Sequence, residues 1–313
     1  MSDNFKTFVV VNPNSANRRT GKKWQQIAQA IKNAIGTFDF ALTTRTMEAP
    51  DITRNAIVKG YEMIVSVGGD GTNNEVINGF FDGRKPLNPE AVFAVFPGGT
   101  GGDLARILGV RGISIEEVAA TLKGRDAVRS DAGLVKLISH DGKEIERCFI
   151  NIADLGIGGE TVALVNRTTK AFGGKASFFI GSLRATLAYR NRHVKFVIDD
   201  GETREGKFYL IVSALGQYFG GGMRIAPLSV HNDGLFDFMI VGDTTFLENM
   251  KLATKIYSGA HLNMPKVERL QGKKLYAESD EKVYIDIDGE QPGILPATFE
   301  ILPQSVRMKQ LKV

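Results

Sequence analysis

A short glycine turn that holds one acidic residue is the first feature of this chain that could do chemistry. Residues 64–75, IVSVGGDGTNNE, read as a buried strand, a glycine turn and a helix start. Thr72 and Glu75 have the T-x-x-E spacing of a capping box, which predicts that the helix begins there. Backbone N–H groups at such a turn form a seat for an anionic phosphate. Asp70 would repel that phosphate unless a cation or a transferable proton lay between them, so the turn points to Mg²⁺-nucleotide chemistry.

Two further loops of similar design accompany this turn. Residues 92–96 read as a strand, 97–102 as a glycine turn and 103–108 as the start of a helix. Near the N-terminus, a strand at 8–11 leads into the small-residue loop 12–16. In an open α/β sheet such loops gather at the carboxyl ends of the strands, where ligands bind. Three such loops together favour a nucleotide site, with glycines that permit positive φ angles and close phosphate approach.

The loops must be positioned by the strands and helices around them. Over residues 1–130 the sequence shows strand patterns and helix patterns in alternation. This alternation predicts an α/β domain with a doubly wound, mostly parallel sheet. From residue 131 to 297 strands dominate, which predicts a second, largely antiparallel β-sandwich-like domain. Helices are expected near 175–191 and 245–257, and the final strands, within 298–313, could return to the first domain. The first domain would bind nucleotide and the second would bind the substrate.

Composition limits the possible functions. The 313 residues are 43% hydrophobic and carry a formal net charge of +4, with a pI near 9.0. The weak positive charge suits an anionic membrane face or an anionic cofactor, but no basic stripe with interleaved aromatics indicates nucleic acid. The single cysteine, Cys148, excludes a disulfide within the chain. No run reaches the roughly 18 apolar residues of a membrane span, and the polar start lacks a secretory apolar region, so we expect a cytoplasmic protein.

Several well-known catalytic signatures are absent from the sequence. It has no G-x-x-x-x-G-K-[ST] phosphate loop, no H-R-D and D-F-G pair, and no G-x-G-x-x-G dinucleotide fingerprint. The four histidines lack zinc-ligand spacing, and no G-x-S-x-G elbow occurs. These absences exclude P-loop nucleotidases and protein kinases.

The sequence resembles the diacylglycerol kinase catalytic-domain family, which includes bacterial lipid kinases and the sphingosine and ceramide kinases. GGDGTNNE at 68–75 with NG at 78–79 is similar to that family's G-G-D-G-T-x-x-E-V-x-N-G motif. Similar matches, in the family's order, are NPNSA at 12–16, PGGTGGDLAR at 97–106, the segment 220–237 and DGE at 288–290. They run through nearly the whole chain. Two departures are Ala16 in place of a usual glycine and Gly102 in place of a usual asparagine, which bear on nucleotide or substrate preference.

The resemblance implies a role for particular residues. Glu290 aligns with the proton acceptor, and Asp70 is the other candidate base or the magnesium partner. A structural Mg²⁺ would be held by the Asp233 carboxylate and the backbone carbonyls of Val230 and Leu235, oxygen ligands that suit this ion. The implied ATP contacts are Asn12, Pro13, Asn14, Ser15, Ala16, Thr43, Gly69, Asp70, Gly71, Thr72, Asn73, Asn74, Glu75 and Thr100. Either Thr43 or its neighbour Thr44 could serve.

The function that follows is an ATP-dependent lipid kinase that phosphorylates a lipid hydroxyl, with diacylglycerol giving phosphatidic acid as the first expectation. A sphingoid-base or ceramide kinase is the alternative within the class. An NAD kinase, which shares the G-G-D-G-T turn, and a nucleotide-binding regulatory protein without turnover are alternatives outside it. We expect peripheral contact with the inner face of the membrane. In residues 172–193 apolar side chains recur at helical spacing among basic ones, so this segment could lie on an anionic bilayer or form a helix packed on the second domain. A homodimer is compatible with the sequence.

Overall fold

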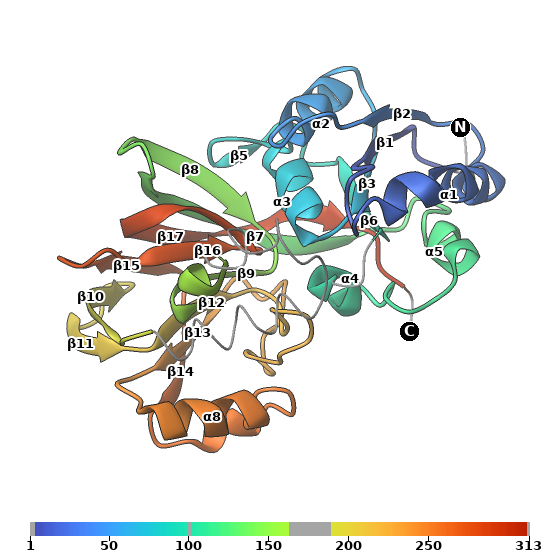
Figure 1. The fold of residues 1–313 in the computed structure, drawn as a ribbon. Coiled ribbons are helices and arrows are strands. Elements are labelled where there is room, and N and C mark those ends of the chain that lie inside the picture. The colour runs from blue at the N-terminus through green and yellow to red at the C-terminus, as the bar shows by residue number, and fades with distance from the viewer. Residues whose placement is uncertain (1–3, 99–101, 163–188, 312–313) are drawn as a thin grey trace. The chain divides into compact units, whose positions relative to one another are not determined.

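Residues 4–98, 102–162 and 189–311 are described by the computed structural model of the chain (Figure 1). The chain divides into two units, the first made of Met1–Ala132 with Leu302–Val313 and the second of Gly133–Ile301. Two strands pass from one unit to the other, β7 (Val128–Ser139) and β17 (Glu290–Met308). The two units are described in turn.

The first unit is built on a parallel sheet with the strand order β17-β6-β3-β1-β2. The middle strands β3 and β6 are almost wholly buried and nearly continuously apolar, which is typical of parallel strands covered on both faces. The elements of this unit besides β17 are β1 (Thr7–Val11), α1 (Arg19–Ile35), β2 (Asp39–Leu42), α2 (Ala49–Val58), β3 (Met63–Gly68), α3 (Asp70–Asn78), β4 (Phe81–Asp82), β5 (Lys85–Pro86), β6 (Val92–Pro97), α4 (Asp103–Ile107) and α5 (Ile115–Thr121).

The second unit is largely antiparallel. Its strands follow the order β14-β13-β12-β9-β16-β17, and β15, β10 and β11 continue from β17. The fold class expected from the sequence is therefore confirmed. The elements besides β7 and β17 are β8 (Glu144–Phe149), β9 (Ile152–Gly156), β10 (Arg192–Ile198), β11 (Arg204–Phe208), β12 (Leu210–Ala214), β13 (Phe236–Val241), α8 (Phe246–Lys255), the 3₁₀ helix Ala260–Asn263, β14 (Val267–Gly272), β15 (Lys274–Glu278) and β16 (Tyr284–Ile287).

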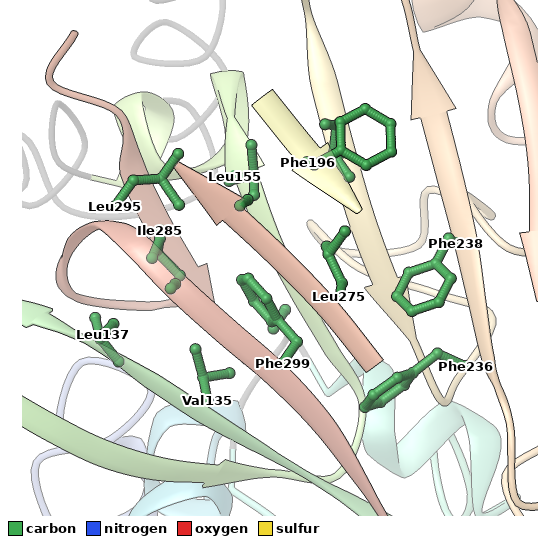
Figure 2. Close-up of a cluster of buried hydrophobic side chains, with 14 of the residues drawn as sticks. Val135, Leu137, Leu155, Phe196, Phe236, Phe238, Leu275, Ile285, Leu295 and Phe299 are labelled. Atoms are coloured by element: carbon green, nitrogen blue, oxygen red, sulfur yellow. The ribbon is translucent and has the colours of Figure 1, made fainter. Parts of the chain in front are cut away.

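A hydrophobic core holds the strands of the second unit together. Figure 2 shows Leu155 of β9 and Ile285 of β16 among the apolar side chains of this core. These two residues face each other directly in the strand register. Because successive side chains of a strand point to opposite faces, their neighbours Asp154 and Asp286 point away from this core. Other members labelled in Figure 2 are Val135, Leu137, Phe196, Phe236, Phe238, Leu275, Leu295 and Phe299.

Several element boundaries differ from those expected. Within the strand-rich part, the mainly apolar stretches 147–153 and 207–214 are each divided between two strands, β8 and β9 in the first case and β11 and β12 in the second. The two strands expected within 298–311 are parts of the single long strand β17. Residues 175–188 of the helix expected at 175–191 lie outside the described residues, and 189–191 are not helical. Alternation of apolar residues predicts which face of a strand is buried. It does not predict where a strand is interrupted, because interruptions depend on hydrogen bonds to residues far away in the sequence.

Candidate active site

Three loops follow adjacent parallel strands of the first unit. The loop 12–16 follows β1, Gly69 follows β3 and Gly98 follows β6, and β3 pairs with both other strands. The carboxyl ends of the three strands therefore meet at one edge of the sheet, as the sequence predicts. Two backbone hydrogen bonds join the loops directly: Asn12 N–H donates to Val67 at 3.0 Å, and Gly98 N–H donates to Gly68 at 2.7 Å.

Side chains tie the same loops together. Asn12 Nδ2 donates to Thr72 Oγ1 at 3.1 Å. Thr20 Oγ1 lies 2.5 Å from Ser15 Oγ and 3.1 Å from the carbonyl oxygen of Gly98, to which it donates. Thr20 is a residue that sequence reasoning missed, because it lies in the first turn of α1, outside every motif. The network fixes the shape of the candidate phosphate seat through hydroxyl groups rather than through glycine alone.

Close packing, and not a positive φ angle, explains the glycines at the strand ends. A methyl group at Gly68 would overlap the side chain of Thr72, and one at Gly98 would overlap Thr20 Oγ1. Gly69 has a φ of −106°, and Gly71 is in regular helix. The expectation that this turn uses positive φ is therefore wrong. In the second loop Gly102, with a φ of 95°, does use it.

Ala16, which stands where the family motif usually has glycine, lies in a strained stretch of backbone. Ala16, Asn17 and Arg18 have φ angles of 53°, 56° and 64°, three consecutive residues in the left-handed region. This region favours glycine, because a Cβ atom crowds the following carbonyl there. Ala16 thus holds a conformation that a glycine would adopt with less strain. The loop immediately precedes α1, whose first residue is Arg19.

Asp70 is the first residue of α3, two residues before the helix start expected from the capping-box spacing. Thr72 makes no cap and bonds Asn12 instead. Asp70 Oδ2 accepts the backbone N–H groups of Gly102 at 3.0 Å and Asp103 at 3.3 Å. Its other oxygen, Oδ1, is buried and has no hydrogen-bond partner in the described part of the chain. One oxygen is therefore held in place while the other can receive a cation or a proton.

The remaining sequence-predicted nucleotide residues are divided between the interior and the surface. Asn73 is buried and accepts a hydrogen bond from Ser66 Oγ at 2.8 Å, and Asn74 is buried beside Asn78. Thr43 is buried and its N–H donates to the Val11 carbonyl at 2.8 Å, which places it at the end of β2 beside β1. Thr100 lies outside the described residues. The half-buried or exposed members are Pro13, Asn14, Ser15, Ala16 and Glu75.

Glu290 lies in the second unit, directly after a two-residue turn between β16 and β17. The turn residues Asp288 and Gly289 have φ angles of 51° and 87°, as a type I′ hairpin turn requires. The Asp288 carboxylate accepts three backbone N–H groups, those of Ile150, Asn151 and Ile152, at 3.0–3.2 Å. These bonds cap the break between β8 and β9 and fix the turn. Glu290 is exposed at the first position of β17, opposite Ile287.

The segment expected to hold a structural metal ion is a turn before β13. Asp233 Oδ1 accepts the N–H of Leu235 at 3.0 Å, and Val230 is exposed. Over the described residues, no group of three or more His, Cys, Asp or Glu side chains could hold a metal ion. This is compatible with a site in which only Asp233 contributes a side chain. The negative charge of Asp233 also helps to raise the pKa of buried Asp237, although burial is the larger cause.

Two family models match the chain. The diacylglycerol kinase catalytic domain matches residues 6–135, and the YegS C-terminal NAD kinase beta sandwich-like domain matches residues 151–310. Together they cover both units, so the chain belongs to the diacylglycerol kinase catalytic-domain family and is a lipid kinase that uses ATP.

Particular relatives agree with this assignment. The chain is 29% identical to a diacylglycerol kinase of Bacillus subtilis over 93% of this chain and 91% of that protein. It is 27% identical to a diacylglycerol kinase of Staphylococcus carnosus over 96% and 93% of the two chains. A crystal structure of a diacylglycerol kinase from Bacillus anthracis has the same fold, with a TM-score of 0.72, 20% identity and coverage of 99% and 98%.

Proposed function

We propose that this protein transfers the γ-phosphate of ATP to the hydroxyl group of diacylglycerol at a membrane surface. The observation that supports this most directly is Asp70. It begins a helix at the carboxyl edge of a parallel sheet, with one oxygen held by two amides and the other buried and available. Relatives named diacylglycerol kinase, similar over most of their length, support this lipid over a sphingoid base or ceramide.

The first unit would bind the nucleotide, and the second unit would bind the lipid. The loops of the first unit would hold the ATP phosphates through backbone N–H groups, and the hydroxyls of Ser15 and Thr20 would keep those loops in shape. The second unit would present the lipid, and Glu290 would take the proton of the attacking hydroxyl. That oxygen forms a bond to the γ-phosphorus, the bond from phosphorus to the β–γ bridging oxygen breaks, and ADP leaves. Such a reaction needs positioning and charge neutralisation more than covalent help from the protein.

Mg²⁺ would serve this chemistry at two places. Asp70 Oδ1, a buried carboxylate oxygen without a partner, fits an ion that accompanies the ATP phosphates. When bound, the ion would neutralise charge that develops on the transferred group. The Asp233 carboxylate with the carbonyls of Val230 and Leu235 would hold a second, structural ion that fixes the turn before β13.

Exposed residues of α8 support peripheral membrane contact. Leu247 of α8 is 71% exposed, and Phe246 of the same helix and Tyr257, two residues after its end, are also exposed. Lys251 and Lys255 are exposed on the same helix, which lies at one end of the second unit (Figure 1). Apolar side chains flanked by lysines suit an anionic lipid surface. No helix in the described ranges is long and apolar enough to cross a membrane. Residues 172–188 of the segment expected from the sequence to contact the membrane lie outside the described residues. On the basis of the exposed residues at α8, we propose that the protein binds the inner, cytoplasmic face of the membrane as a peripheral protein.

The proposal is tested by phosphate transfer from radiolabelled ATP to a panel of lipid hydroxyls in vesicles: diacylglycerol, sphingosine, ceramide and, as a soluble acceptor, NAD. Diacylglycerol should be the preferred acceptor. Asp70→Asn should abolish transfer while the fold survives, because the residue lies in a turn and not in a core. Transfer to NAD in preference to every lipid, or near-normal turnover by folded Asp70→Asn, would contradict the proposal.

A further inference from the structure

Two buried carboxyl groups in the second unit face each other across neighbouring antiparallel strands. Asp154 of β9 lies directly opposite Asp286 of β16 in the register. Their side chains are 1% and 8% exposed. Directly opposed residues of an antiparallel pair have Cβ atoms about 5 Å apart, and like charges in such a pair destabilise the sheet. Neither residue belongs to the family motifs in the sequence, and the proposed phosphate transfer does not use them.

The pair is poor in hydrogen-bond donors. No well-aligned hydrogen bond reaches either oxygen of Asp154 or Oδ1 of Asp286 among the residues that the structure describes. The backbone N–H groups of Gly159 and Gly289 lie near enough to lower the two pKa values, but by less than burial raises them. The Asp154 carboxyl packs on the backbone of Gly158, where a methyl group would overlap it. A buried carboxylate normally accepts several hydrogen bonds, because its charge is costly to remove from water. The surroundings of Asp154 and Asp286 therefore favour the neutral, protonated carboxyl group over the charged carboxylate.

The surrounding charges add to this effect. Burial, the larger cause, raises the pKa of Asp154 to about 8. The pKa of Asp286 is raised well above its ordinary value by burial first and then by the negative charges of Asp154, Asp288 and Glu290. Tyr189, a half-buried phenol, interacts with Asp154, and the cation beside it, Arg192, is already paired with two carboxylates. Those two partners of Arg192 are Glu160 and Glu281, of which Glu160 also acts on Tyr189.

The position of Asp286 connects the pair to Glu290. The register between β16 and β17 runs from Ile285 opposite Gly293 to Ile287 opposite Glu290, so β17 has an extra residue beside Asp286. Such a bulge bends the strand and re-aims side chains next to it. One residue further, Asp288 caps the β8–β9 break and starts the turn that carries Glu290.

We propose that Asp154 and Asp286 share one proton at neutral pH, and that this protonated pair holds the β9–β16 register and thereby positions Glu290. A shared proton turns the like-charge repulsion into a charge-assisted O–H···O⁻ hydrogen bond between the two strands. The catalytic part of this inference rests on the proposed role of Glu290. The shared proton itself does not depend on that role.

The pair makes stability fall with rising pH. Unfolded aspartates titrate near 4, whereas in the folded protein the pKa of Asp154 is raised to about 8 and that of Asp286 well above its ordinary value. Between these values the folded state binds more protons than the unfolded state, so raising the pH favours unfolding. The apparent Tm of the wild-type protein should therefore fall by roughly 5 °C or more from pH 5 to pH 8 relative to a variant without the pair.

The test compares Asp154→Asn, Asp286→Asn and the double variant with wild type and with Asp280→Asn, an exposed aspartate of the same unit. Asparagine mimics the protonated carboxyl, so the double variant should have the flatter Tm profile, and the control should match wild type. At pH 7, Asp154→Asn should keep most of the kcat on diacylglycerol vesicles, while Asp154→Ala should lose about tenfold in kcat with little change in the KM for ATP. The alkaline fall of kcat should move to higher pH in Asp154→Asn.

Wild-type slopes of Tm and kcat against pH in all three asparagine variants would overturn the proposal. If the variants do not fold, carboxyl ¹³C NMR of aspartate-labelled wild-type protein decides the matter. An aspartate that titrates above pH 7 supports the shared proton, and complete ionisation of all aspartates by pH 6 overturns it. Failure of the kinase proposal would appear separately, as a wild-type protein that phosphorylates no lipid, while the Tm and NMR results still decide on the proton.

Discussion

At the scale of single residues, two acidic side chains near the proposed chemistry are held by backbone amides in different ways. Asp288 accepts three N–H groups, and Asp70 accepts two on one oxygen only. Amides that donate to a carboxylate fix its orientation. Asp288 therefore has a structural role, fixing the turn that presents Glu290, whereas Asp70 keeps one oxygen available.

Replacing Glu290 by Gln should separate binding from chemistry. Glutamine keeps the size and polarity of the side chain but cannot accept the proton, so kcat should fall by about 10²–10⁴-fold. The KM for ATP should change little, because the candidate phosphate loops belong to the first unit. The rate profile should lose its acidic limb if Glu290 is the base. Steady-state kinetics across pH check this, with exposed Glu202→Gln as the control. An unchanged kcat would leave Asp70 as the remaining candidate.

Replacing Asp233 by Ala should lower activity and stability together. A structural ion links one carboxylate to two backbone carbonyls, so loss of the carboxylate loosens the turn before β13. We expect the apparent Tm to fall by roughly 3–6 °C, and excess Mg²⁺ should not restore it. Calorimetry with and without a chelator checks this. The chelator should destabilise wild type and the exposed-turn control Asp200→Ala, but not Asp233→Ala. If the chelator does not change the apparent Tm of wild type, the proposal of a structural ion at this turn is wrong.

At the scale of elements, the ends of β1, β3 and β6 are locked together by small side chains. The hydroxyl of Thr20 lies between Ser15 and the Gly98 carbonyl, and Gly98 leaves no room for a methyl group. Because these contacts span three loops, a small change at one loop should shift the others. The geometry of the candidate phosphate seat thus depends on packing between elements.

Replacing Gly98 by Ala should weaken ATP binding. The added methyl would overlap Thr20 Oγ1 and lie 3.1 Å from Ser15 Oγ, so the loops must move apart, and the KM for ATP should rise about tenfold. Removing the hydroxyl in the double variant Gly98→Ala/Thr20→Ala should recover part of the loss. ATP titrations of the three variants measure this coupling. As a control for stability, Gly69→Ala should melt like wild type, because its methyl meets no atom within 4 Å. Equal KM values for wild type and Gly98→Ala would place the phosphates elsewhere.

At the scale of the whole molecule, the candidate phosphate loops and Glu290 belong to different units that β7 and β17 connect. A water-soluble nucleotide and a membrane lipid need different surroundings, and two units can provide them. The exposed apolar and basic residues of α8 belong to the unit assigned to the lipid. Membrane binding should therefore depend on α8 and not on the first unit.

Replacing Leu247 by Glu should reduce binding to anionic vesicles by about tenfold or more, because a buried leucine contributes about 1.5–3 kcal/mol and the new charge is repelled. Val58→Glu is the matched control, an equally exposed apolar residue on a helix of the first unit. Vesicle co-sedimentation measures binding, and activity on a short-chain, water-soluble diacylglycerol should stay near wild type in both variants. Equal loss of vesicle binding in the two variants would show a nonspecific charge effect instead.

The sequence alone determined the fold class, the three loops and the position of Asp70 at a strand-to-helix turn. Local patterns carry these features, because strand alternation and glycine turns are properties of neighbouring residues. They also placed Glu290 beside an Asp-Gly turn. The helix start at Asp70 instead of Thr72 was not predictable, because Thr72 bonds Asn12, a partner 60 residues away.

Only the tertiary structure decided which long-range partners each residue has. The break between β8 and β9 depends on Asp288, more than 130 residues later in the chain. Thr20 joins the site through Gly98, and Asp154 meets Asp286 through the strand register. Hydrogen bonds and charge pairs of this kind join residues that only folding brings together. The local periodicity of the sequence therefore does not predict them. The pairing of strands therefore determined the details of the site that the motifs left open.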